Sequence, residues 1–123
     1  VAPVIVTGNT AVVVSSERRP LPAVTFAEVL ATSDLPGGVV NILTGSYAGP
    51  GPWLASHMDV NALDLTGAAG DVAGARAMEE AAAENLKRVL RAPDAEPDWL
   101  AAPGIDRMTA CLETKTVWHP KGR

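Results

Sequence analysis

The chain has 123 residues, of which 47% are hydrophobic and 20% charged, and its formal net charge is -4. This length allows one domain, near the lower end of what folds alone. The hydrophobic fraction excludes an intrinsically disordered tail. No basic cluster is longer than the pairs Arg18-Arg19 and Lys87-Arg88. A nucleic-acid binder needs a basic stripe, so no nucleic-acid partner is expected.

The single cysteine and the apolar N-terminal residues indicate the cellular compartment. Cys111 has no second cysteine with which to form an internal disulfide, which fits a reducing compartment. The apolar run at residues 1–6 contains Pro3, is too short to span a bilayer and has no basic flank, so neither a signal peptide nor a membrane association is expected. We therefore expect a cytoplasmic protein. Because the first residue is Val1 and not Met, we also expect the chain to begin inside a longer precursor.

Strand and helix patterns alternate in the first half of the chain. The β-branched run at residues 10–14 predicts a buried strand, and the apolar run at 39–44, closed by Gly45, predicts a second. Between them, residues 22–33 have a helical period that ends at Leu35-Pro36-Gly37-Gly38. Residues 45–52 are rich in Gly and Pro and predict a loop, with at most a short helix at 53–57. The helix at 22–33 is expected to turn inward the side chains of Val24, Ala27, Leu30 and Ala31.

The second half repeats the alternation. Residues 62–66 predict a third strand, ended by Gly67, and residues 87–90 a short fourth one. A long helix is predicted at 71–86, capped by Asp71, with Glu84 and Arg88 in favourable i,i+4 order. Alternating strands and helices give parallel strands with crossover helices, so the predicted fold class is α/β. The buried stripe of the long helix is expected to hold Val72, Ala75, Met78, Ala82 and Leu86.

The last third of the chain has no sustained helix or strand pattern, so we divide the chain into two regions after residue 90. Residues 91–123 begin with an irregular linker that is punctuated by Pro93 and by Pro103-Gly104. The alternating segment at 112–119 predicts a terminal strand. A lone strand exposes backbone donors and acceptors on both sides, so it needs a sheet to join, in this subunit or in another.

Catalytic and metal motifs are absent from the sequence. His57 and His119 are far apart and lack the partner spacing of a metal site, so no metal is expected. Cys111 has no Gly-rich turn or helix start around it to lower its pKa, which favours a half-buried structural thiol. Ser15-Ser16-Glu17 has no histidine nearby to form a hydrolase triad. We therefore assign no catalytic residue.

Glycines after the strands leave two interpretations open. Gly49-Pro50-Gly51 begins like G-x-G-x-x-G, but Leu54 occupies the third glycine position and no Walker lysine follows. In open α/β sheets, ligands lie beyond the carboxyl ends of the strands, which here are residues 14–17, 45–51 and 67–70. Either a mononucleotide half-site lies there, or these glycines only make tight turns.

Four motifs in order resemble one family. They are Gly8-Asn9-Thr10 with Ser16-Glu17 and Pro20-Leu21; Leu35-Pro36-Gly37-Gly38-Val39-Val40-Asn41 with Gly45; His57 to Gly67; and Asn85-Leu86-Lys87-Arg88-Val89. They are similar to the A-G-N-T-V-V-x-K-P-S-E-x-x-P-L, L-P-x-G-V-V-N-x-x-x-G, H-x-D-V-x-x-x-x-F-T-G and N-x-K-x-V segments of aldehyde dehydrogenases. Their order and spacing match over residues 1–89. The chain is thus identified as the coenzyme-binding segment of a shortened member of that superfamily.

The resemblance implies a Rossmann-like coenzyme domain for NAD or NADP. It carries the ribose-binding Glu onto Glu17 and the pyrophosphate-binding Gly-Ser onto Gly67 and Ala68, while the second strand end adds Gly45 and Gly51 as cofactor-binding positions. Two positions depart from the family. Val14 stands where the family has its ribose-binding Lys, and Ala68 lacks the serine hydroxyl. Each loss costs about 1–3 kcal/mol of binding free energy, so we expect coenzyme binding to be weak or lost.

The family's catalytic groups are also missing. After Arg88-Val89 the chain reads Leu90-Arg91-Ala92-Pro93 in place of L-E-L-G-G-K, which carries the family's general base. No G-Q-x-C follows, so the nucleophile of the covalent intermediate is absent. The resemblance therefore implies a catalytically degenerate chain that does not oxidise an aldehyde by itself.

Residues 111–117 resemble the family's terminal Y-x-E-x-K-x-V strand, which belongs to its oligomerisation region. This similarity implies a partner, either a second copy or a related aldehyde dehydrogenase subunit, bound through Thr114–Trp118. A non-catalytic structural or regulatory subunit is the expected function. A weak NAD(P)-binding module and a segment of a working dehydrogenase are the alternatives.

Overall fold

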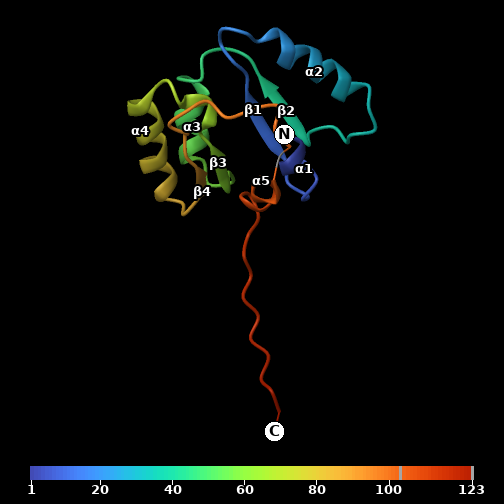
Figure 1. Ribbon diagram of the computed structural model, residues 1–123, viewed down its shortest axis with the longest axis vertical. Helices are drawn as coiled ribbons and strands as arrows, with labels where there is room; N and C mark the ends of the chain where they lie inside the picture. The colour runs from blue at the N-terminus through green and yellow to red at the C-terminus, as the bar shows by residue number, and fades with distance from the viewer. Residues whose placement is uncertain (103, 123) are drawn as a thin grey trace.

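The computed structural model describes residues 1–102 and 104–122. Strands and helices alternate along this part of the chain, and an extended C-terminal tail leaves the body (Figure 1). The elements follow in the order α1 (Ala2–Ile5), β1 (Ala11–Val14), α2 (Leu21–Ala31), β2 (Val40–Leu43), α3 (Pro50–Ser56), β3 (Ala62–Asp64), the 3₁₀ turn η1 (Thr66–Ala68), α4 (Val72–Ala83), β4 (Arg88–Leu90) and α5 (Ile105–Thr109).

The four predicted strands form, and they pair in parallel through crossover helices. β1 pairs with β2, with Ala11 opposite Val40, and α2 connects them. β3 pairs with β4, with Ala62 opposite Arg88, and α4 connects them. The predicted α/β class with parallel strands and crossover helices is thus confirmed.

The strands are divided between two sheets of two strands each, as far as the described residues show. α5 lies between the two sheets in Figure 1 and also contacts α1. The β2–β3 connection carries α3, which packs against α4 and so belongs to the β3–β4 half. Each of the two crossover helices, α2 and α4, therefore connects the two strands of one sheet.

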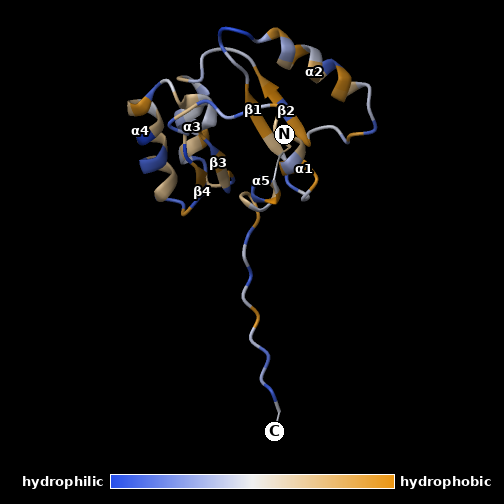
Figure 2. Cartoon of the chain, viewed as in Figure 1, coloured by the Kyte–Doolittle hydropathy of each residue, from blue (hydrophilic) through white to orange (hydrophobic). Residues whose placement is uncertain are grey.

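The hydrophobic core lies almost entirely in the β3–β4 half. Its buried cluster comes from α3, α4, η1 and the residue before η1, and consists of Ala55, Leu65, Ala68, Ala75 and Met78. In the β1–β2 half, α2 has no buried residue, and Val12 and Leu43 are 48% and 40% exposed. Figure 2 shows that β1 and β2 are nonetheless strongly hydrophobic. The β1–β2 half thus carries apolar surface that this chain does not cover.

The long helix α4 confirms its predicted cap but is shorter than predicted at its C-terminus. Asp71 accepts a hydrogen bond from the Gly74 backbone N–H at 2.9 Å, which satisfies one of the free donors of the first turn. The helix ends at Ala83, because Leu86 adopts a left-handed φ of 53° in the turn before β4. The predicted Glu84–Arg88 pair is therefore wrong: Arg88 lies in a strand.

Burial confirms the centre of the predicted α4 stripe and contradicts its ends. Ala75, Met78 and Ala82 are buried, whereas Val72 and Leu86 are 79% and 90% exposed. Val72 is the first helical residue, and Leu86 lies beyond the last one, so neither follows the period of the helix core.

The other two predicted helices shift by a few residues. α2 begins at Leu21, and of its predicted inner face Ala27 and Leu30 are half-buried, whereas Val24 and Ala31 are exposed. α3 begins at Pro50, earlier than the predicted 53–57, because prolines fit the first turn of a helix, where no N–H donor is needed.

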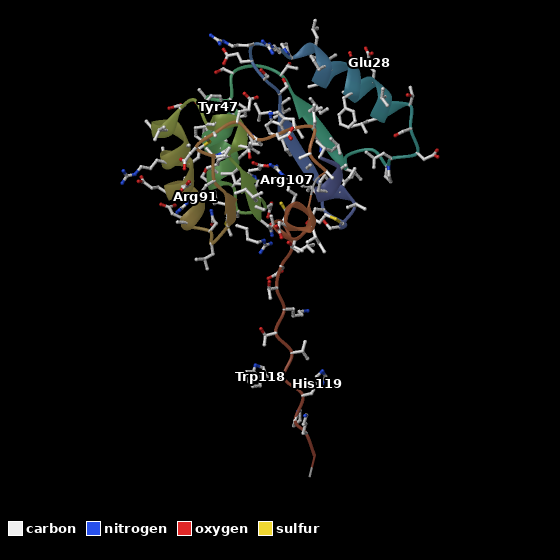
Figure 3. The ribbon with its side chains drawn as sticks, in the orientation of Figure 1. Glu28, Tyr47, Arg91, Arg107, Trp118 and His119 are labelled. Atoms are coloured by element: carbon white, nitrogen blue, oxygen red, sulfur yellow. The ribbon has the colours of Figure 1, made fainter. Side chains whose placement is uncertain are left out.

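The C-terminal region differs most from the prediction. The short helix α5 was not predicted, and the expected strand at 112–119 pairs with nothing among the described residues. These residues are extended and exposed, and Trp118 and His119 lie far from the body (Figure 3). An extended segment becomes a strand only when a neighbour completes its hydrogen bonds.

No helix in the described residues is long and apolar enough to cross a membrane.

Candidate functional site

The carboxyl end of β1 leads into Ser15, which is 7% exposed. Its backbone N–H extends the β1–β2 ladder by donating to the Leu43 carbonyl at 2.9 Å. Its hydroxyl is buried without a hydrogen-bond partner among the described residues. Buried hydroxyls are normally satisfied, so Ser15 carries an unpaired polar group enclosed at this end of the strand. From the sequence, Ser15 is a candidate only as part of a hydrolase triad and of the strand end at residues 14–17.

The predicted cofactor-binding residues occupy different environments. Glu17 is exposed on the β1–α2 connection, and Gly45 follows β2 with a φ of 122°, which favours glycine. Gly67 is exposed in η1, with open space where a side chain would begin. Gly51 and Ala68 are buried: a Cβ on Gly51 would lie 3.0 Å from the Met78 sulfur, and Ala68 belongs to the core cluster. Three of the five residues therefore face solvent and two face the core.

A pair of side chains that sequence reasoning missed stands at the same end of the strands. Tyr47, after β2, donates a hydrogen bond from its hydroxyl to Asp71 Oδ2, at the start of α4. This bond from Tyr47, followed by that from the Gly74 backbone, lowers the pKa of Asp71. The same bond raises the pKa of Tyr47, and the nearby Glu17 carboxylate adds a small electrostatic contribution. Tyr47 and Asp71 are 24 residues apart, and no local pattern joins them.

This arrangement changes what the N-terminus of α4 can bind. Free backbone N–H groups and the helix dipole attract anions at such an end. Here the Asp71 carboxylate already receives the Gly74 N–H and supplies the negative charge, and Glu17 lies close enough to act on Tyr47. An incoming phosphate would meet carboxylates where it needs donors.

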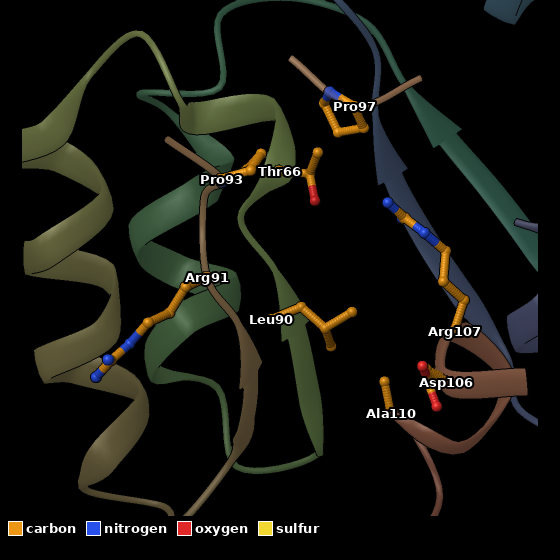
Figure 4. Close-up of a pocket in the computed structure, with 8 residues that line it drawn as sticks. All are labelled: Thr66, Leu90, Arg91, Pro93, Pro97, Asp106, Arg107 and Ala110. Carbon is orange, nitrogen blue, oxygen red and sulfur yellow. The ribbon is translucent and has the colours of Figure 1, made fainter. Parts of the chain in front are cut away.

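Two hollows lie beside these elements, and neither is lined by any of the five predicted residues. The smaller has a volume of about 180 Å³ and lies between α3 and α4, next to Tyr47 and Asp71. The larger, of about 310 Å³, lies beside the carboxyl ends of β3 and β4, with α5 on its far side (Figure 4).

A model of the aldehyde dehydrogenase family matches residues 1–107. The chain belongs to the aldehyde dehydrogenase family. It is 43% identical over 89 residues to aldehyde dehydrogenase family 2 member C4 of Arabidopsis thaliana, covering 72% of this chain and 17% of that protein. An aldehyde dehydrogenase-like protein of Schizosaccharomyces pombe is 31% identical over 122 residues, or 99% of this chain and 23% of its own length.

A solved structure supports the same membership. The aldehyde dehydrogenase from Bartonella henselae superposes with a TM-score of 0.54 at 34% identity, over 65% of this chain and 16% of that one. This chain thus spans less than a quarter of the length of these aldehyde dehydrogenases, and the resemblance drawn from its motifs is confirmed.

The aldehyde dehydrogenase resemblance implies NAD or NADP at the strand ends, and the residues present fit it only in part. The exposed Glu17 carboxylate can accept hydrogen bonds from ribose hydroxyls. The side chains around the pyrophosphate position do not fit, because Ala68 has no hydroxyl and is buried, and Asp71 is a carboxylate bound to the first turn of α4. The whole dinucleotide therefore does not match the side chains at this site.

Cys111 is not built as a nucleophile of the aldehyde dehydrogenase kind. The thiol is partly buried, as expected, and this burial is the main reason why its pKa is raised; Asp64 raises it further and Arg88 opposes the shift. A reactive cysteine needs a lowered pKa. Within the part of the chain that the structure describes, no three His, Cys, Asp or Glu residues gather into a potential metal site.

Proposed function

We propose that this chain is a non-catalytic aldehyde dehydrogenase relative, which binds NAD or NADP weakly or not at all and acts as a structural or regulatory subunit. The observation that carries this proposal is the start of α4, where Asp71 and Tyr47 are bonded to each other next to Glu17. A carboxylate at the position of an incoming pyrophosphate opposes dinucleotide binding through like-charge repulsion. The valine at position 14 removes the lysine that the resemblance implies for the ribose.

Titration of the purified chain with NAD and with NADP tests the coenzyme part. We expect no saturation below the millimolar range by isothermal calorimetry. The substitution Val14→Lys should tighten binding by about tenfold, because one charged hydrogen bond is worth roughly 1.5–3 kcal/mol. Val12→Lys is the matched control: it adds the same charge earlier in β1 and should change nothing. Micromolar binding of NAD or NADP by the unaltered chain would contradict the proposal.

The tail supports the assembly part of the proposal. Val117 and Trp118 are 63% and 89% exposed, and the segment is extended with free backbone groups on both sides. We propose that Thr114–Trp118 joins a second copy or a related aldehyde dehydrogenase subunit. Light scattering after size exclusion should show a species larger than the monomer, which shrinks to the monomer when Val117 and Trp118 are both replaced by Asp. A strict monomer at every concentration would count against this part.

Two other functions each have an observation in their favour. Residual coenzyme binding is favoured by the exposed Glu17 carboxylate, and the same titrations test it. A segment of a working aldehyde dehydrogenase is favoured by identities of 34–43% to named aldehyde dehydrogenases over part of their length. The gene sequence on both sides of this segment tests that function: a downstream L-E-L-G-G-K and G-Q-x-C would establish it and refute a non-catalytic chain.

The proposed location is the cytoplasm. It rests on the single cysteine, Cys111, which fits a reducing compartment. One similar protein, from Leishmania tarentolae, is named a mitochondrial aldehyde dehydrogenase. Fractionation of the source cells decides between the two compartments.

A further inference from the structure

Two arginines border the larger hollow, and the side chain of one of them points into it. Arg91 and Arg107 both border it, but the Nε of Arg91 pairs with Glu79 Oε2 at 3.2 Å, and its side chain points away from the hollow (Figure 4). Arg107 leaves α5 and reaches along the hollow toward Pro97 (Figure 4). It is half-buried and takes part in none of the ion pairs found among the described residues.

The Arg107 guanidinium lies against the ring of Trp99. Its central carbon lies 5.8 Å from the centre of the Trp99 ring, and the Trp99 indole N–H donates to Glu96 Oε1 at 3.1 Å. Stacking on an aromatic ring uses the face of a guanidinium and leaves its N–H groups free. These groups are arranged as a fork, which matches the two oxygens of a carboxylate.

The remaining walls select the kind of anion. Leu90, Pro93, Pro97 and Ala110 make much of the lining apolar. The Thr66 hydroxyl already donates to Asp64 Oδ1 at 2.5 Å, so Arg107 is the donor that remains. Asp106 also borders the hollow, and its charge offsets that of Arg107. A site with no net charge disfavours a dianion and suits a monoanion with an apolar body.

We propose that this hollow binds a small aliphatic monocarboxylate, with its carboxylate on Arg107 and its hydrocarbon part against Leu90, Pro93 and Pro97. The volume of about 310 Å³ is at the lower end of small-molecule sites. The hollow adjoins the carboxyl ends of two parallel strands, and open α/β sheets bind ligands near that edge. It shares no residue with the five coenzyme positions, so it stands independently of the proposed function.

Trp99 provides a direct readout of binding. Replacing Trp53 and Trp118 by Phe leaves it as the only tryptophan, and both replaced residues are highly exposed, at 78% and 89%. Butyrate at constant ionic strength should change its fluorescence saturably in the millimolar range, whereas uncharged butyramide and inorganic phosphate should not. From acetate through propionate to butyrate, each methylene should tighten binding about two- to fourfold.

Variants then identify the group that binds. Arg107→Gln should weaken butyrate binding by about tenfold or more, because it removes the charged hydrogen bonds. Arg91→Gln is the matched control on the same wall and should stay within about twofold. Asp106→Asn should tighten binding, since it removes a repelling carboxylate. Far-UV circular dichroism checks that each variant is folded.

Four results would overturn the proposal: butyrate and butyramide bind equally well, phosphate binds more tightly than butyrate, the two arginine variants lose the same affinity, or no saturable signal is found. The series of carboxylates on the arginine-intact protein keeps the test valid even if a variant fails to fold, because a lack of chain-length dependence would equally contradict the apolar contact.

Discussion

Asp71 uses both of its carboxylate oxygens at the start of α4. Oδ1 accepts the Gly74 N–H, and Oδ2 accepts the Tyr47 hydroxyl. The first bond was predictable, because Asp before an apolar helical period is a common cap. The second bond was not, because it joins a loop to a helix across 24 residues and depends on how α3 packs against α4.

The Tyr47–Asp71 bond predicts opposite pH dependences for its two partners. The folded-state pKa of Asp71 lies below its usual 3.8, so its stabilising effect is complete above the unfolded pKa and is lost as the pH falls through the folded one. The folded-state pKa of Tyr47 lies above its usual 10.0, so its effect is present below that value and is lost as the pH rises through the folded pKa. NMR titration of both side chains measures this.

Tyr47→Phe tests the cause of these shifts. The pKa of Asp71 should then move up toward 3.8, since the bond from Tyr47 is the largest cause of its depression. Glu17→Gln is the control and should lower the pKa of Tyr47 only slightly, because Glu17 is its smallest cause. If Asp71 titrates identically in the Phe variant, the hydrogen bond is not the cause.

Two glycines near the strand ends should respond differently to alanine. Gly45 has a φ of 122°, so Gly45→Ala forces a side chain into a strained backbone and should cost about 1–2 kcal/mol of unfolding free energy. Gly67 has ordinary backbone angles and open space beside it, so Gly67→Ala should stay within about 0.5 kcal/mol. Urea denaturation measures both, and equal losses would contradict the assigned roles.

Among the helices and strands, the sequence pattern predicted those that depend on local hydrogen bonds and on the spacing of apolar residues. β1 and β2 follow from runs of β-branched and apolar residues, and α4 from its cap and its buried Ala75, Met78 and Ala82. The patterns failed where the outcome depends on a neighbour. α5 is a short helix that contacts α1 from far along the chain, and the predicted terminal strand finds no sheet to join.

Because α5 packs against the body and the tail does not, the two should contribute differently to stability. Residues 113–122 are exposed, so a chain that ends at Leu112 should keep its unfolding free energy within about 0.5 kcal/mol. A chain that ends at Ala102 also loses α5, with the half-buried Arg107, Met108 and Cys111, and should be clearly destabilised. Thermal unfolding of the two shortened chains measures the difference. Destabilisation by the shorter deletion would show that the tail packs on the body.

For the whole molecule, the exposed area is large. The accessible surface is 9488 Å², whereas a folded monomer of 12.7 kDa is expected to expose about 6,200 Å². The tail contributes to this excess, and so do α2, Val12 and Leu43 in the β1–β2 half. The buried core is small and rich in alanine. Uncovered apolar surface of this extent is consistent with the proposal that the chain joins a second subunit.

Native mass spectrometry of the protein purified from its own cells tests whether this chain is a non-catalytic subunit, because it reports both subunits and bound coenzyme. A non-catalytic subunit predicts an assembly with a second copy or another aldehyde dehydrogenase subunit, with no NAD or NADP on this chain. Replacing Val117 and Trp118 by Asp should dissolve the assembly, while Leu100→Asp, at an exposed residue outside the tail, should leave it intact. A monomer that carries bound NAD or NADP would contradict the proposed role as a non-catalytic subunit.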